Sequence, residues 1–211
     1  MTTIHPQLND AGQPVKITTP HTCSPASEWK NATAMALGVP GAKFPDSMNG
    51  IRFEAWEEAP STDSVWEAMA GRMALCSSPF ICPPGLKPAA GAVIVEPDGR
   101  VWCVAPTNRF GGHEYTFPKG RTDGRSTAAT ALVEVFEETG LHIQLEALLC
   151  DVKRATTYTR FYVASRLGGT PSAAGWESQA VMLAPVATLR KLLTHQGDQA
   201  VLDAYELLAT S

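Results

Sequence analysis

The sequence predicts a layered α/β domain built on a mixed β-sheet. Within residues 89–211, five segments have the apolar or alternating pattern of strands, and three have the apolar repeat of helices. The expected strands are 89–96, 100–106, 142–152, 158–166 and 176–183. The expected helices are 126–139, 185–193 and 199–208. Because one helix falls among the strands and two follow them, a sheet layered with helices is expected. Periodicity alone does not choose the order of the strands.

Composition limits the class of protein. The chain has 211 residues, of which 44% are hydrophobic and 18% charged, as in a globular domain with an extension. A net charge of −4 argues against nucleic acid or an anionic membrane as a partner. The first residues lack a signal-peptide pattern and no long apolar run follows, so a cytoplasmic location is expected. The five cysteines include no CxxC pair, which argues against a disulfide framework.

The first 45 residues are rich in Pro, Thr, Asn and Gly and are expected to form a loosely attached arm. One short helix is predicted at 27–37, stopped by Gly38. Trp29 and Met35 are expected to fasten the arm to the body, since an exposed Trp is uncommon.

A hairpin and a helix are predicted next. The dipeptide Asn49-Gly50 favours a tight turn, and residues 51–53 alternate as in a strand. A helix capped by Ser61 or Thr62 follows. The face expected to be buried carries Val65, Met69 and Met73.

A Pro-rich stretch at 77–88 is predicted to divide the chain. Residues 1–88 would form an N-terminal extension, and residues 89–211 would form the main domain. The first two strands of that domain, 89–96 and 100–106, are joined by a Pro-Asp-Gly turn and are expected to form a hairpin.

Residues 117–141, FPKGRTDGRSTAATALVEVFEETGL, carry the strongest functional pattern. A loop leads into a helix that begins after Ser126 and ends at Gly140. Three acids related by i+3 and i+4 steps lie on one side of that helix: Glu134, Glu137 and Glu138. They repel one another and lie where the helix dipole disfavours negative charge, so a cation is needed. Mg²⁺ suits such a carboxylate cluster, and a solvated acidic face is the alternative.

This stretch resembles the Nudix hydrolase signature, G-x5-E-x7-R-E-U-x-E-E-x-G-U, where U is apolar. The matching residues are Gly120, Glu134, Val135, Glu137, Glu138, Gly140 and Leu141. The loop is one residue short, Arg125 replaces the first glutamate, and Val133 replaces the arginine. In the family that arginine is understood to orient the metal-binding glutamates, which Val133 cannot do.

The resemblance implies a Nudix fold, in which a mixed β-sheet is sandwiched between α-helices, over about residues 89–193. It also implies Mg²⁺- or Mn²⁺-dependent hydrolysis of a pyrophosphate bond in a small nucleotide. The substrate would be a nucleoside diphosphate linked to another moiety, of the ADP-sugar or dinucleoside polyphosphate type. A catalytically weakened nucleotide-binding module on the same fold is the main alternative. A third reading makes residues 1–88 a partner-binding arm or the interface of a homodimer.

The resemblance and the positions in the chain assign roles to individual residues. The implied metal ligands are Glu134, Glu137, Glu138 and the backbone carbonyl of Gly120. The implied catalytic residues are Glu137, Glu138 and, as a base from the loop before the last strand, Glu177. For Glu177 a solvated loop acid is the alternative. The cations expected to contact phosphate are Lys119, Arg121, Arg154 and Arg109.

Overall fold

A seven-stranded mixed sheet forms the centre of the computed structural model, which describes residues 3–75 and 78–210. Its strands are β3 (Ala36–Gly38), β6 (Lys87–Val95), β7 (Val101–Pro106), β8 (Lys119–Arg121), β9 (Leu141–Lys153), β10 (Thr157–Gly169) and β11 (Ser178–Ala184). They lie in the order β3-β11-β7-β6-β10-β9, and β8 also pairs with β6. Strand β10 runs parallel to β6, whereas the other pairs are antiparallel. The predicted mixed sheet is confirmed.

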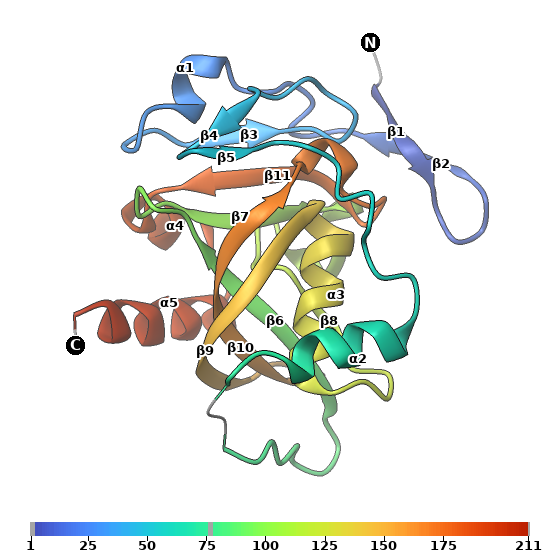
Figure 1. Cartoon of the computed structure of the whole chain (residues 1–211), viewed down its shortest axis with the longest axis vertical. Helices are drawn as coiled ribbons and strands as arrows, with labels where there is room; N and C mark the ends of the chain where they lie inside the picture. Colours follow the sequence, from blue (N-terminus) through green and yellow to red (C-terminus); the bar gives the residue numbers. More distant parts are fainter. Residues whose placement is uncertain (1–2, 76–77, 211) are drawn as a thin grey trace.

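Helices cover both faces of this sheet (Figure 1). Helices α2 (Asp63–Gly71) and α3 (Thr127–Thr139) pack on one face, and α4 (Val186–Leu192) and α5 (Gln196–Ala209) pack on the other. Along β6, Ala92 and Ile94 join the cluster under α3, whereas Val93 joins the cluster under α4 and α5. This alternation follows from the pleat of a strand. None of the helices in the described ranges is long and apolar enough to cross a bilayer.

Helix α3 has the ends that its sequence predicts. The Ser126 hydroxyl accepts a hydrogen bond from the Ala129 N–H at 3.2 Å and so caps the first turn. At the other end Gly140 is left-handed, with φ of 68° and ψ of 9°. A β-carbon at Gly140 would overlap the carbonyl of Thr170, so glycine is required there for space as well as for backbone angle.

The N-terminal region is joined to the main sheet, so the expectation of a loosely attached arm is wrong. Helix α1 is only Ala26–Trp29, and the end of the helix predicted at 27–37 is instead strand β3, paired with β11. Trp29 is 1% exposed and packs on Trp102 of β7. Burial of that side chain and the backbone pairing of β3 outweigh a weak helical pattern. Buried side chains from both sides of residue 88 join one core cluster. The division of the chain near residue 88 stays a prediction.

Two hairpins lie in the same region. The predicted turn at Asn49-Gly50 joins β4 (Ser47–Met48) to β5 (Ile51–Arg52), with positive φ at both turn residues. A further hairpin, β1 (Thr3–Leu8) with β2 (Pro14–Ile17), was not predicted.

Helix α2 begins where predicted but buries a different face. Trp66 and Ala70 are buried, and Met69 and Met73 pack against the same core. Val65 is 46% exposed, so its predicted burial is wrong. The reason is that α2 packs on α3, and this turns Trp66 toward Phe136.

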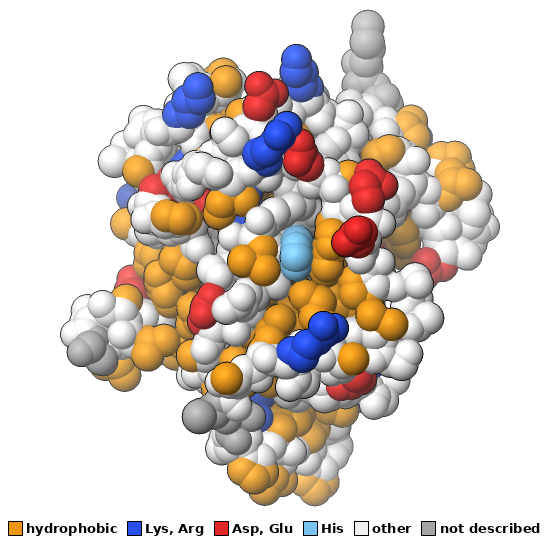
Figure 2. Space-filling view, in the orientation of Figure 1, with side chains coloured by type: hydrophobic (Ala, Val, Ile, Leu, Met, Phe, Trp, Pro, Cys, Tyr) orange, Lys and Arg blue, Asp and Glu red, His pale blue; other side chains and the backbone are white. Residues whose placement is uncertain are grey.

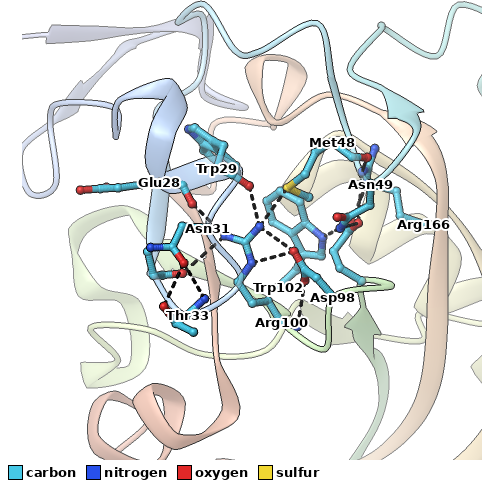
Figure 3. A network of polar contacts seen from close by, with 12 residues as sticks. Glu28, Trp29, Asn31, Thr33, Met48, Asn49, Asp98, Arg100, Trp102 and Arg166 are labelled. Carbon is cyan, nitrogen blue, oxygen red and sulfur yellow. Dashed lines mark hydrogen bonds and ion pairs between the residues drawn. The ribbon is translucent and has the colours of Figure 1, made fainter.

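A buried polar network joins the N-terminal region to the hairpin of β6 and β7 (Figure 3). The Arg100 guanidinium is 1% exposed and donates to the carbonyl oxygens of Trp29 at 2.6 Å and Glu28 at 3.1 Å. Beside it, Arg166 and Glu96 form an ion pair at 2.5 Å with both side chains 0% exposed. These contacts attach Glu28, Trp29 and Met48 of the N-terminal region to the main sheet.

Glu67 of α2 holds the start of α3. Its carboxylate accepts from the Ser126 N–H at 2.6 Å and from the Ser126 hydroxyl at 2.7 Å. We expect Glu67→Ala to lower the free energy of unfolding by about 1 kcal/mol, because two charge-assisted bonds at a helix N-terminus are lost. Urea denaturation would measure this, with Glu57→Ala on the exposed preceding segment as control. An unchanged midpoint for Glu67→Ala would contradict the expectation.

Candidate active site

Two of the three acids on α3 face strand β8. Glu134 is 9% exposed, and its carboxylate lies so close to Gly120 that a β-carbon there would overlap it. One turn later, Glu138 accepts a hydrogen bond from the Lys119 backbone N–H at 3.0 Å. Glu137 is exposed on the outer side of the helix. Pairing of β8 with β6 sets this arrangement, because it fixes Gly120 and Lys119 beside the helix.

The electrostatics of these acids favour a cation beside them. Burial raises the pKa of Glu134 to about 8, and the negative charges of Glu138 and Glu137 add to the effect. Burial also raises the pKa of Glu138 to about 7, although the Lys119 ammonium opposes the rise. A carboxyl group in such surroundings keeps its proton near neutral pH unless a cation takes its place.

The donor set fits a divalent cation. Within the described ranges, no three His, Cys, Asp or Glu side chains converge closely enough to hold a metal by themselves. Mg²⁺, however, is commonly bound by one or two carboxylates together with waters and substrate phosphates. Glu134 and Glu138 could supply those two carboxylates, and the lack of a side chain at Gly120 makes room for the Glu134 carboxylate itself.

Arg125 also reaches this site. Its guanidinium lies 3.7 Å from Glu134 Oε1 and 3.2 Å from Asp63 Oδ1 of α2. Val133, at the position of the signature arginine, is 2% exposed in the apolar core and cannot contact the acids. The sequence showed both departures from the signature but not that Arg125 would lie beside Glu134.

Glu177 lies in the loop that meets the C-terminal end of α3. The Gly175 N–H in this loop donates to the Glu137 carbonyl oxygen at 2.6 Å. Glu177 is near enough to raise the pKa values of Glu134, Glu137 and Glu138. Its own pKa is raised by partial burial and by Asp10. The negative charge of Glu177 therefore acts in the same direction as those of the acids on α3.

Of the four predicted cations, Lys119 and Arg154 lie together. The Lys119 ammonium donates to Thr116 Oγ1 at 2.9 Å, and the same hydroxyl donates to the fully buried Asp198. Arg154 forms an ion pair with Asp198. Asp198 was missed because it lies on α5, far along the chain, in a helix that shows no functional motif.

The other two cations are exposed. Arg121, the last residue of β8, is 53% exposed and lies 3.5 Å from Asp123 in the loop that follows. Arg109 is in the irregular 3-10 segment η1 (Thr107–Gly112), with a positive φ of 51°. The structure therefore brings Lys119 and Arg154 together around Asp198 and leaves Arg121, at the end of β8, and Arg109, in η1, exposed at the surface.

The family is decided by a match that covers the acids, the loops around them and strands β6 to β11 of the sheet. A family model described as the NUDIX domain matches residues 85–205, more than half of the chain. The chain belongs to the Nudix family. The match begins after α2, so this helix and the strands before it lie outside the Nudix domain as the family model defines it.

Among known proteins, the chain is similar to the Xenopus laevis protein named nucleoside diphosphate-linked moiety X motif 6. The two are 43% identical over 61 residues, which span 28% of this chain and 28% of that protein. Solved structures are also similar to this chain. A Caenorhabditis elegans Ap4A hydrolase complex has a TM-score of 0.48 at 18% identity and covers 58% of this chain and 98% of its own. A putative Nudix hydrolase from Chromobacterium violaceum has a TM-score of 0.49 at 26% identity, with coverage of 61% and 82%.

Proposed function

We propose that this Nudix protein is a Mg²⁺-dependent pyrophosphohydrolase. Its substrate would be a nucleoside diphosphate linked to another moiety, of the ADP-sugar or dinucleoside polyphosphate type. The observation that carries the proposal is the pair of largely buried carboxylates, Glu134 and Glu138, held against β8 with raised pKa values. The name of the Xenopus laevis relative supports the substrate class.

Glu134 and Glu138 would hold the metal, with the Gly120 carbonyl as a further donor. A bound Mg²⁺ neutralises phosphate oxygens and lowers the pKa of a water. Glu137 and Glu177 lie on the outer side of these ligands, where one of them would accept the proton of the attacking water. Partial burial raises the pKa of Glu177, which moves it toward the range of an effective base at neutral pH.

The cations would contact the phosphates. Lys119 adjoins both Glu138 and the pair formed by Arg154 and Asp198, so its charge lies beside the proposed metal. Arg121 and Arg109 are exposed and would meet the substrate as it enters. On the face shown in Figure 2, acidic and basic side chains are interspersed, without one broad basic surface. A small nucleotide, recognised locally, fits this distribution better than a long nucleic acid.

A direct assay would distinguish the proposed hydrolase from the second candidate function, a module that binds nucleotides without hydrolysing them. The departures at Arg125 and Val133 favour that second function. The full chain would be incubated with ADP-ribose, dinucleoside polyphosphates, NADH or nucleoside triphosphates, each with Mg²⁺ or Mn²⁺. Phosphomonoester products would be detected by chromatography. Product formation is expected, whereas tight binding without products would favour the module.

Metal binding is expected to release protons. At pH 7 the carboxyl groups of Glu134 and Glu138, with pKa values of about 8 and about 7, are partly protonated without a metal. Binding of Mg²⁺ should displace roughly one proton per ion at this pH, and the apparent affinity should rise from pH 6 to pH 8. Titration calorimetry in buffers with different ionisation enthalpies would count the protons. An affinity independent of pH would contradict the expectation.

The same groups should make the metal-free stability depend on pH. Because the folded-state pKa values lie above the ordinary value of 4.5, the folded chain binds more protons than the unfolded chain between those limits. The stability contributed by these groups therefore falls as the pH rises from about 4.5 to about 8. Added Mg²⁺ should reverse this loss at pH 8, and thermal unfolding would measure it.

A further inference from the structure

Arg125 joins helix α2 to the proposed metal ligand Glu134. Its guanidinium is 18% exposed and lies 3.7 Å from Glu134 Oε1. The other terminal nitrogen lies 3.2 Å from Asp63 Oδ1, at the first residue of α2. A planar guanidinium can contact two carboxylates at once, which a lysine ammonium does with less defined geometry.

A second contact from α2 fixes the residue next to Arg125. Glu67 accepts from both the Ser126 N–H and the Ser126 hydroxyl, at 2.6 Å and 2.7 Å. Asp63 and Glu67 are four residues apart on one face of α2, so this face binds two consecutive residues before α3. Helix α2 itself is anchored by Trp66, which is 5% exposed and packs on Phe136.

These contacts give the N-terminal region a role in the site. Val133 is buried in the apolar core, so α3 supplies no arginine from that position. We infer that Arg125, held by Asp63 and with its neighbour Ser126 held by Glu67, is a positioning residue that orients Glu134 for metal binding. It contacts one oxygen of the Glu134 carboxylate and leaves the other for the ion. The inference rests on the proposed function, because the metal is that of the proposed hydrolase.

Titrating the full chain with Mn²⁺ in a calorimeter tests the positioning role of Arg125 without any substrate. Arg125→Ala is expected to weaken Mn²⁺ binding about tenfold, as the loss of a residue that orients a ligand commonly does. Arg125→Lys keeps the charge but not the two-sided contact and should fall between Arg125→Ala and the natural chain. Asp63 is 68% exposed, so Asp63→Asn should weaken binding only about twofold. In the Arg125→Ala background Asp63→Asn should have no further effect, because Asp63 acts through Arg125.

The matched control is Arg52→Ala, which removes an exposed ion pair with Glu54 from the same part of the chain and should leave Mn²⁺ binding unchanged. If Arg125→Ala does not fold, the comparison of Arg125→Lys and Asp63→Asn with the natural chain decides the question. Mn²⁺ affinity that is unchanged or tighter in these variants would overturn the inference, as would a natural chain that binds no Mn²⁺. A natural chain that binds Mn²⁺ through Arg125 but hydrolyses no nucleotide would overturn only the proposed function.

Discussion

A Glu138→Gln variant is expected to lose about a thousandfold in kcat/KM for the best nucleotide substrate while keeping its fold. Removing a carboxylate ligand takes away several kcal/mol of transition-state stabilisation by the metal, and each 1.4 kcal/mol is tenfold in rate. The fold should be kept because the glutamine side-chain oxygen can still accept from the Lys119 N–H, which the natural carboxylate binds at 3.0 Å. Steady-state kinetics at saturating Mg²⁺ would measure the loss.

The stability of the Glu138→Gln variant shows whether its loss of activity comes from the missing ligand or from misfolding. Burial raises the pKa of Glu138 to about 7, so a neutral amide at this position should not destabilise the metal-free protein. The matched control is Glu146→Gln, which alters an exposed acid on β9 bonded to Ser165, away from the site. Glu146→Gln should retain full activity. A Glu138→Gln enzyme with activity close to the control would remove Glu138 from the mechanism.

An Arg166→Met variant is expected to lose about 3–5 kcal/mol of unfolding free energy, because it leaves the charge of Glu96 buried without a counter-ion. Arg166 donates to both oxygens of Glu96, at 2.5 Å and 3.2 Å, and to the Met48 carbonyl oxygen at 3.1 Å. For a domain of this size such a loss corresponds to a fall of about 10 °C in melting temperature. Thermal or urea denaturation would measure it.

A double variant, Arg166→Met with Glu96→Gln, tests the stated cause. Glutamine removes the unpaired charge, and its oxygen can still accept from Trp102 Nε1, which the natural carboxylate binds at 2.8 Å. The double variant should therefore recover part of the stability that Arg166→Met loses. If the double variant were less stable than the single one, loss of the contact between the Arg166 guanidinium and the Phe53 ring would explain the effect better than the unpaired charge of Glu96.

The sequence alone determined the elements whose signals are local. The caps Ser126 and Gly140 set the ends of α3, and the Asn49-Gly50 turn set a hairpin. Each depends on a few neighbouring residues, so pattern and backbone preference are sufficient to predict it. The same holds for the site. Glu134, Glu137 and Glu138 share one helix, and the Nudix signature around them could be recognised although Arg125 and Val133 depart from it and the loop is one residue short.

Only the tertiary structure decided the contacts between distant segments. It paired β3 with β11, brought the loop of Glu177 against the C-terminal end of α3, and linked Asp198 of α5 to Arg154 directly and to Lys119 through Thr116. It also set α2 against the signature loop, where Asp63 and Glu67 hold Arg125 and Ser126. The physical reason is that hydrophobic burial and sheet pairing act through space, whereas periodicity and capping report only on neighbours within about one helical turn. A loop arginine such as Arg125 gives no sequence signal of the carboxylate that it will meet.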